Sequence, residues 1–180
     1  MGNFSVGDYF KHEAIAFAFE LLTSPEYFDI DKNLIYVTIY SNDEEAKNRW
    51  IEVGLDPSHI IPLVGNFWEI GEGPCGPDTE MFYFRSNDEI PTKFDPEDDN
   101  WVEIWNNVFM QYNHEEDGTF TPLRNKNVDT GLGVERVTAI LEGQTDNYKS
   151  SIWKDIIAKI ENRSGVDNIR EICQECEGIM

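Results

Sequence analysis

The residues best suited to chemistry in this sequence lie in one short run, Val128–Arg136. Gly131 and Gly133 let a backbone approach a ligand closely at the start of an expected helix, whose N-terminal amides attract anions. Arg136 follows inside that helix with a guanidinium that suits phosphate oxygens, and Asp129 can accept a hydrogen bond from an ammonium group. A phosphate and an amine in one site would indicate a nucleotide and an amino acid.

An ordinary structural role also explains this run. Both glycines can be turn residues at a helix start, and the arginine can pair with a nearby acid. On spacing alone this second interpretation is favoured, because two glycines separated by one residue are a weak signal. Other segments must therefore decide between the two.

Other reactive side chains are less well placed. Cys75 has no histidine near it in sequence, which favours packing over nucleophilic catalysis. Cys173 and Cys176 would supply half of a zinc site, but the remaining thiol and the three histidines show no paired spacing, so no metal site is expected. Glu80 is a candidate for positioning a magnesium ion or loop amides, although capping is the commoner role.

Apolar periodicity and turn residues predict the elements that position these side chains. The expected helices are Asp8–Leu22, a polar helix capped by Asp43 and ending at Gly54, Leu132–Leu141 and Ile152–Ile160. The expected strands are Leu34–Tyr40, Thr79–Arg85 and a hairpin with arms at 102–112 and 119–123.

Three segments carry more specific expectations. In the first helix, Phe17 belongs to the apolar face that should meet the core. Between Gly65 and Pro77, the density of glycine and proline predicts an ordered loop of the kind that carries functional sites. Residues 86–117 hold ten acidic side chains, and most of this stretch is expected to be a solvated insertion.

Composition limits the function classes. The chain has 180 residues, a formal net charge of −21 and 40% hydrophobic residues. This charge disfavours a protein that grips nucleic acid over its whole surface, and the apolar content is too high for a disordered acidic chain. With no leader, no apolar stretch long enough to span a membrane and an odd number of cysteines, a cytoplasmic location is expected.

Four segments in the same order resemble the alanyl-tRNA synthetases, a family of class II ligases. These segments are Met1–Lys11, Asn66–Glu80, Glu103–Tyr112 and Val128–Arg136. The first resembles the second half of class II motif 2, and the last resembles motif 3. The resemblance covers residues 1–163 and implies a partial aminoacylation domain, with 164–180 as a tail of unknown role. It implies an α+β fold with a mainly antiparallel sheet flanked by helices.

The family binds alanine, ATP and Mg²⁺, forms alanyl-adenylate and transfers alanine to the 3′ end of tRNA(Ala). By resemblance, Asp129 accepts a hydrogen bond from the alanine ammonium, and Gly131 leaves room for the substrate. Trp68 walls a pocket sized for one methyl group, with Val108 as the small apolar contact opposite. Asn106, on the same strand parity as Val108, would hydrogen-bond alanine, unless neighbouring backbone satisfies it instead.

The ATP side of the site would use Arg136 on the phosphates as the catalytic residue, with Gly133 at the helix start. Phe4 is the candidate for stacking on adenine, and its alternative is a core role in a cluster with Phe10 and Phe17. Adenylate formation depends mostly on charge stabilisation and positioning, so no histidine is expected to act as acid or base.

The sequence departs from the family pattern in two places. It begins inside motif 2, without the arginine that relatives carry on the first strand of that motif, and it has Asp78 where a cysteine is common. We expect the chain alone to have little adenylation activity, to bind tRNA weakly because of its charge and to self-associate through an open sheet edge. The alternative function is a non-catalytic module that binds alanine, an adenylate or a protein partner.

Overall fold

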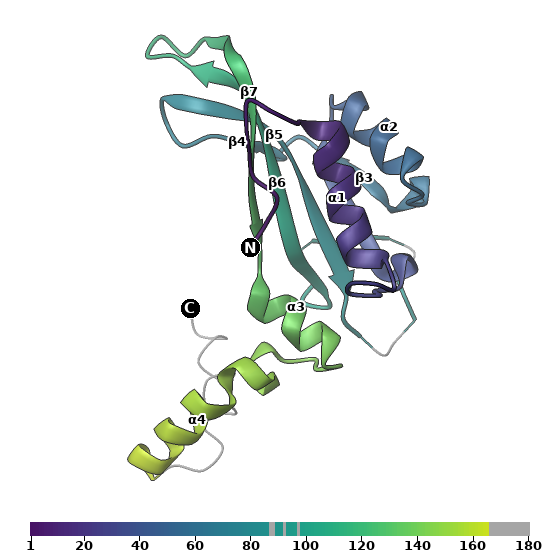
Figure 1. Cartoon of the computed structure of the whole chain (residues 1–180), viewed down its shortest axis with the longest axis vertical. Coiled ribbons are helices and arrows are strands. Elements are labelled where there is room, and N and C mark those ends of the chain that lie inside the picture. The colour runs from purple at the N-terminus through teal and green to yellow at the C-terminus, as the bar shows by residue number, and fades with distance from the viewer. Residues whose placement is uncertain (87–88, 92, 97, 166–180) are drawn as a thin grey trace. The chain divides into compact units, whose positions relative to one another are not determined.

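The computed structural model describes residues 1–86, 89–91, 93–96 and 98–165 (Figure 1). The chain divides into two compact units, Met1–Gly133 and Val134–Met180. The first unit holds the sheet and two α-helices, and the second holds α3 and α4. Within the described ranges, no helix reaches the length and hydropathy that crossing a membrane requires.

A seven-stranded sheet organises the first unit. Its strands are β1 (Ser5–Val6), β2 (Ile35–Tyr40), β3 (Ile60–Leu63), β4 (Phe67–Trp68), β5 (Gly73–Phe84), β6 (Trp101–His114) and β7 (Phe120–Leu132). They are ordered β1-β7-β6-β5-β2-β3, with β4 paired to β5 off this path. The pairings are antiparallel, apart from the parallel pair β2 and β3. The expected α+β fold with a mainly antiparallel sheet is confirmed.

Two helices, α1 (Lys11–Thr23) and α2 (Glu44–Glu52), lie against one face of this sheet (Figure 1). The indole of Trp50 in α2 donates to Thr79 Oγ1 in β5 at 3.0 Å, and both side chains are buried. Phe10, just before α1, makes an edge contact with Phe109 in β6. The core on this side is built from Ala14, Ile15, Ala18, Leu22, Val37, Ile39, Met81, Trp105 and Phe109.

A buried ion pair joins the starts of the two helices. Lys11 Nζ lies 2.7 Å from a carboxylate oxygen of Asp43, and neither side chain is exposed. Asp43 also accepts a hydrogen bond from the Ala46 amide and so caps α2 as the sequence predicts. Because each charge has its partner, the desolvation of both groups is compensated.

The apolar face expected for the first helix is wrong at one position. Phe17 is 46% exposed, and the buried face of α1 instead carries Lys11, Ala14, Ile15, Ala18 and Leu22. The small side chains of Ala14 and Ala18 let the helix approach the sheet closely. Lys11 can be buried on the same face because it pairs with Asp43. A large ring is therefore excluded from the contact and turns outward, where Phe17 meets Tyr9 edge to face.

The loop expected between Gly65 and Pro77 is mostly strand. β4 occupies Phe67–Trp68, and β5 already begins at Gly73. The glycine at position 76 serves close packing, because a Cβ built there would lie 2.1 Å from the carbonyl oxygen of Phe109 in the neighbouring strand. Gly76 thus reflects the approach of β6 to β5, whereas Gly71 and Gly73, with φ of 64° and 126°, serve the bend before β5.

The expectation that residues 86–117 form mostly a solvated insertion is also wrong. β6 fills 101–114 and pairs with β5 on one side and β7 on the other. Ahead of it, Phe94 is buried in an aromatic cluster with Phe82, Phe84 and Trp101. Of the acidic side chains in this segment, only Glu103 lies within β6, and the others come before or after the strand.

The hairpin after residue 100 is confirmed, but its second arm is longer than predicted. β7 runs through to Leu132, so Asp129 and Gly131 are strand residues. The second unit contains α3 (Val134–Leu141) and α4 (Ser151–Ser164), which confirm both expected helices with shifted ends. Cys173 and Cys176 lie outside the described residues.

The outer edge of β7 is partly covered. β1 pairs with Asn127 and Val128, and the backbone of Met1 exchanges hydrogen bonds with that of Leu132. On residues 120–126 of the same strand, the side chains of Arg124 and Lys126 are exposed. Self-association through this edge stays a prediction, and these two charges oppose it.

Candidate functional site

The sheet face opposite α1 and α2 carries most of the residues selected from the sequence. Successive side chains of a strand point to opposite faces, and Thr79 points to the helices, so Asp78 and Glu80 point to the other face. Residues paired across antiparallel strands share a face. The register therefore defines a polar face made of Thr38, Asp78, Glu80, Asn106, Val108, Asp129 and Gly131.

Two rows of paired residues cross this polar face. In the first row, Asp78 in β5 lies opposite Val108 in β6, which lies opposite Asp129 in β7. In the second row, Glu80 lies opposite Asn106, which lies opposite Gly131. The structure thus brings Asp129, Val108, Asn106 and Gly131, four of the residues expected to bind alanine, onto one face of the sheet.

Three members of this group differ in burial and in the space around them. Val108 is buried and forms an apolar floor between two strands. A Cβ built on Gly131 would meet no atom within 4 Å, so the space above this glycine is open. Asp129 is half-buried, and one of its oxygens accepts a hydrogen bond from the Thr130 amide at 2.9 Å.

A hydrogen-bond network adjoins the group. The side-chain amide of Asn66, just before β4, donates to Thr38 Oγ1 at 2.8 Å, to Asp78 Oδ1 at 2.8 Å and to Glu80 Oε2 at 3.2 Å. Thr38 also donates to Glu80 Oε2 at 2.9 Å. Glu80 thus binds side-chain donors of this face, and the roles in positioning magnesium or loop amides, or in capping, stay predictions.

The network also holds β4, and with it Trp68. The backbone amide of Asp78 donates to the carbonyl oxygen of Asn66 at 3.0 Å, and Trp68 pairs with Gly76 in β5. Trp68 is half-buried on this short strand. Its place as a pocket wall stays a prediction, and the strand that carries it is fixed to the polar face through Asn66.

Asp78 has an unusual titration. Asp78 is 5% exposed, and its pKa is raised from 3.8 to about 7, mainly by burial. The nearby charges of Glu80 and Glu103 also act to raise this pKa, whereas hydrogen bonding with Asn66 and Asn106 acts to lower it. Perturbed carboxyls of this kind are concentrated at functional sites, because a structural role seldom requires a buried charge.

The residues expected to bind ATP lie in different parts of the chain. Phe4 is 60% exposed ahead of β1, so its alternative role in the core is wrong, and its ring is available for stacking. The Gly133 amide donates to the carbonyl oxygen of Ile104 at 2.9 Å, which fixes the end of the first unit. Arg136 is exposed on the first turn of α3, in the second unit.

The remaining reactive side chains serve structural contacts. Cys75 is a buried free thiol whose pKa is raised by burial and then by Glu69, as a packing role predicts. His59 stacks on Tyr36, and His114 stacks on Phe120. Among the residues that the structure describes, no group of three or more histidine, cysteine, aspartate or glutamate side chains is arranged to hold a metal ion.

Sequence reasoning assigned no role to Asn66, Thr38 or Asp78 in this site. The usable signal is strand parity. Thr38 alternates with the buried Val37 and Ile39, and Asp78 shares its parity with Glu80, so each polar residue belongs to the face away from the core. Which polar residues converge there depends on strand order, and the sequence does not display that order.

A family model for class II (A) tRNA synthetases matches residues 1–178. The chain belongs to this family. It is 49% identical to an alanine–tRNA ligase of Pediococcus pentosaceus, over 92% of this chain and 20% of the relative. It is 50% identical to that of Ligilactobacillus salivarius, over 88% of this chain and 19% of the relative. The alanine–tRNA ligase of Acholeplasma laidlawii is 49% identical over 92% of this chain and 20% of its own length.

This chain therefore spans about a fifth of the length of the class II (A) relatives that it matches. The resemblance found from four motifs is confirmed as family membership. The expected division into a domain at 1–163 and a tail at 164–180 stays a prediction, and the two compact units meet at Gly133.

Proposed function

We propose that this chain is part of the catalytic domain of an alanine–tRNA ligase, and that its polar face binds the alanine to be activated. The observation that carries this proposal is the strand register, which sets Asp129, Val108 and Gly131 side by side in neighbouring strands. The Asp129 carboxylate suits the ammonium of alanine, and the small apolar side chain of Val108 suits its methyl group. The open space above Gly131 leaves room for the backbone of the amino acid.

Alanine would be held by its charge and selected by its size. The Asp129 carboxylate accepts a charge-assisted hydrogen bond from the ammonium, and a half-buried carboxylate makes this bond stronger than one in water. Val108 contacts the methyl group, and Trp68 closes the pocket against longer side chains. Asn106 hydrogen-bonds the amino acid from the same face.

By resemblance to the family, Phe4 would stack on the adenine of ATP, and Gly133 and Arg136 would contact its phosphates. The exposed ring of Phe4 supports the first contact, and the exposed guanidinium of Arg136 at a helix start supports the second. An alanine carboxylate oxygen attacks the α-phosphorus of ATP, and pyrophosphate leaves. Arg136 contributes by stabilising negative charge as it develops on the phosphate oxygens.

Magnesium would accompany ATP in this reaction and neutralise phosphate charge. The described side chains do not gather into a metal-binding group, and Mg²⁺ at such sites is often held by one or two carboxylates and the phosphates themselves. Transfer to the 3′ end of tRNA(Ala) would complete the reaction in a cytoplasmic enzyme, although a chain with a net charge of −21 should bind tRNA weakly by itself.

The proposal is tested by calorimetric titration of the purified chain with sulfamoyl adenylates, which are non-hydrolysable analogues of aminoacyl-adenylates. The alanyl compound should bind saturably, and the leucyl compound should bind more than about tenfold more weakly, because its side chain exceeds the pocket. The glycyl compound should lose only about 1–3 kcal/mol. Equal affinity for the alanyl and leucyl compounds, or no binding by folded protein, would contradict the proposal.

A non-catalytic module that binds alanine or its adenylate would give the same titration. Retention of Asp129, Val108 and Gly131 on one face accommodates both functions. Alanine-dependent exchange of labelled pyrophosphate into ATP separates them, since only an enzyme forms the adenylate reversibly. Exchange would assign the ligase activity to the chain, and saturable binding without exchange would favour the module.

A further inference from the structure

A pocket of about 380 Å³ lies against α1, on the face of the sheet that the helices cover. Phe17 and Glu20 line it from the helix, because residues three positions apart share a helix face. Tyr27, just after the helix, and Trp105 in β6 also line it. Trp105 precedes Asn106 in its strand and therefore points to the opposite face of the sheet. The pocket is thus separate from the polar face.

Three of the side chains that line this pocket are aromatic. Phe17 and Tyr27 are 46% and 55% exposed, whereas Trp105 is 2% exposed. The indole Nε1 of Trp105 donates to Thr130 Oγ1 at 2.6 Å, which fixes the position of this ring. Aromatic rings offer apolar area together with negatively polarised faces, and such faces attract cations. The volume of the pocket falls within the range of sites that hold small molecules.

Glu20 supplies a carboxylate to the same pocket. Its side chain is exposed, and in the described part of the chain this carboxylate has neither an ion pair nor a hydrogen bond. Met1 also lines the pocket, but its α-ammonium donates to the carbonyl oxygen of Leu132 at 3.2 Å rather than to Glu20. The pocket therefore has an anionic group that is available to a ligand.

Asn3 adds an acceptor to the lining. Its Nδ2 donates to the carbonyl oxygen of Ala14 in α1 at 2.9 Å. The Oδ1 of the same amide is buried and has no hydrogen-bond partner among the described residues. A buried acceptor in this state costs free energy, which an N–H donor next to it recovers. The polar groups of the lining thus favour a ligand that donates hydrogen bonds.

We propose that this pocket binds a small organic cation, in which an ammonium group is attached to a compact aromatic body. The ring faces attract the positive charge, Glu20 accepts a charge-assisted hydrogen bond from it, and the apolar body fills the space between the rings. The net charge of −21 also draws cations toward the chain and repels anions. The inference goes beyond the proposed function, because the two sites lie on opposite faces of the sheet.

Titration of the ¹⁵N-labelled chain, followed by two-dimensional NMR at pH 7, tests the recognition of charge. The probe is 2-phenylethylammonium, and 2-phenylethanol is its neutral counterpart with the same ring and chain length. The ammonium compound should bind about tenfold more tightly than the alcohol, with the largest shift changes at the backbone amides of Phe17, Leu21 and Tyr27. The anion 3-phenylpropionate should show no saturable binding. Equal affinity for the ammonium compound and the alcohol would overturn the inference.

The variant Glu20→Gln removes the charge of the pocket with little change of shape. It should lower the preference for the ammonium compound over the alcohol by about threefold, because the lost ion pair lies at an exposed rim. The matched control is Glu116→Gln, which removes an exposed carboxylate elsewhere in the same unit and should leave the preference unchanged. An equal fall in both variants would show attraction by net charge alone and would contradict a specific site.

The variant Phe17→Leu removes one ring and keeps an apolar wall. Since leucine has no π face, the preference for the ammonium compound should fall by about threefold, while the affinity for the alcohol changes by less than about twofold. The side chain is half outside the core, so the variant should stay folded. Equal weakening of both compounds would show that the rings do not recognise the charge, which contradicts the inference.

An ammonium compound could also bind the proposed alanine site, and Asp129→Asn separates the two sites. Binding at the pocket should be unchanged in this variant, because Asp129 lies on the polar face. If Asp129→Asn abolishes binding of 2-phenylethylammonium and Glu20→Gln leaves it intact, the cation binds at the polar face. The inference would then be wrong, and the proposed function would stand.

Discussion

The two faces of the sheet use the same strands with opposite content. Toward α1 and α2, β5 and β6 present fully buried apolar side chains such as Met81 and Phe109. Toward the polar face, the same strands present Asp78 and Val108, and burial there raises the pKa of the Asp78 carboxyl. The apolar face therefore stabilises the fold. On the polar face, burial of the Asp78 carboxyl costs folding free energy, which the packing of the apolar face must offset.

The largest expected effect lies on the apolar face. Phe109→Ala removes a fully buried ring that contacts Phe10, and it should lower the free energy of unfolding by about 3–5 kcal/mol. Urea denaturation followed by tryptophan fluorescence measures this change. A loss below about 1 kcal/mol would show that the helix-covered face is not the source of stability.

Two strand glycines give a matched comparison within the sheet. Gly76→Ala drives a Cβ into the carbonyl oxygen of Phe109, at 2.1 Å, and should cost about 1–3 kcal/mol or more. Gly131→Ala enters open space and should change stability by less than about 0.5 kcal/mol, while weakening the alanyl analogue by filling its pocket. Equal stability losses in urea denaturation would contradict the different roles of these glycines.

The raised pKa of Asp78 makes its contribution to stability depend on pH. The folded state binds this proton more tightly than the unfolded state, whose pKa is near 3.8, so stability relative to Asp78→Asn falls as pH rises toward 7. Between pH 5 and 7, the free energy of unfolding of the unchanged chain should fall by about 2 kcal/mol relative to that of the variant. Above pH 8 this difference between the two proteins should become constant. Urea titrations of both proteins at several pH values measure this difference in unfolding free energy. A difference that does not change with pH would show that the pKa of Asp78 is not raised.

Sequence patterns predicted the helices and strands more accurately than the contacts between them. The helices and the hairpin follow from periodicity, and Asp129, Gly131 and Val108 could be selected because motif segments resemble a known family. Phe17 and the segment around Gly76 were misjudged for a shared reason. In both, the partner strand or ion pair that determines the local structure lies far away in sequence.

The hydrogen-bond network was beyond sequence reasoning for the same reason. Asn66, Thr38 and Asp78 come from three separate segments, and only the order β6-β5-β2 together with β4 brings them together. The titration of Asp78 depends on burial by those neighbours. The net charge of the sequence does not show that this aspartate, unlike the exposed acidic residues, is buried and has a raised pKa.

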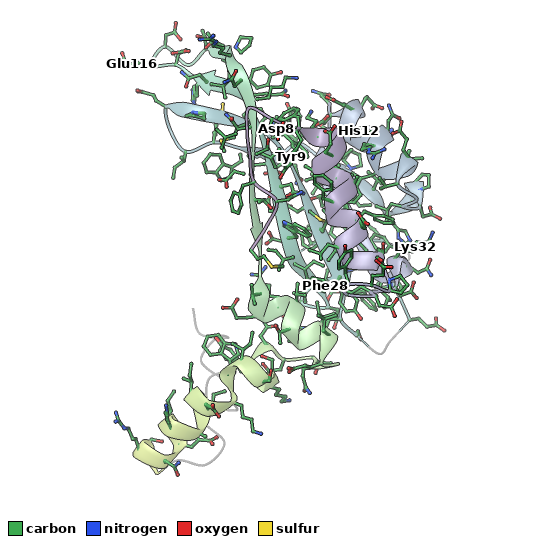
Figure 2. The ribbon with its side chains drawn as sticks, viewed as in Figure 1. Asp8, Tyr9, His12, Phe28, Lys32 and Glu116 are labelled. Carbon is green, nitrogen blue, oxygen red and sulfur yellow. The ribbon has the colours of Figure 1, made fainter. Side chains whose placement is uncertain are left out.

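The most direct test of the central claim compares Asp129→Asn with a matched control, Glu116→Gln. Figure 2 shows Glu116 at the turn between β6 and β7, and its side chain is exposed. Both changes remove one negative charge, but only the first removes the carboxylate that accepts from the alanine ammonium.

We predict that Asp129→Asn weakens calorimetric binding of alanyl sulfamoyl adenylate by about 2 kcal/mol or more, about thirtyfold, because an ionic partner is lost in a half-buried site. Glu116→Gln should leave the affinity unchanged, and neither variant should unfold. Equal affinity of the unchanged chain and the folded Asp129→Asn variant would contradict the claim that the polar face is an amino-acid site.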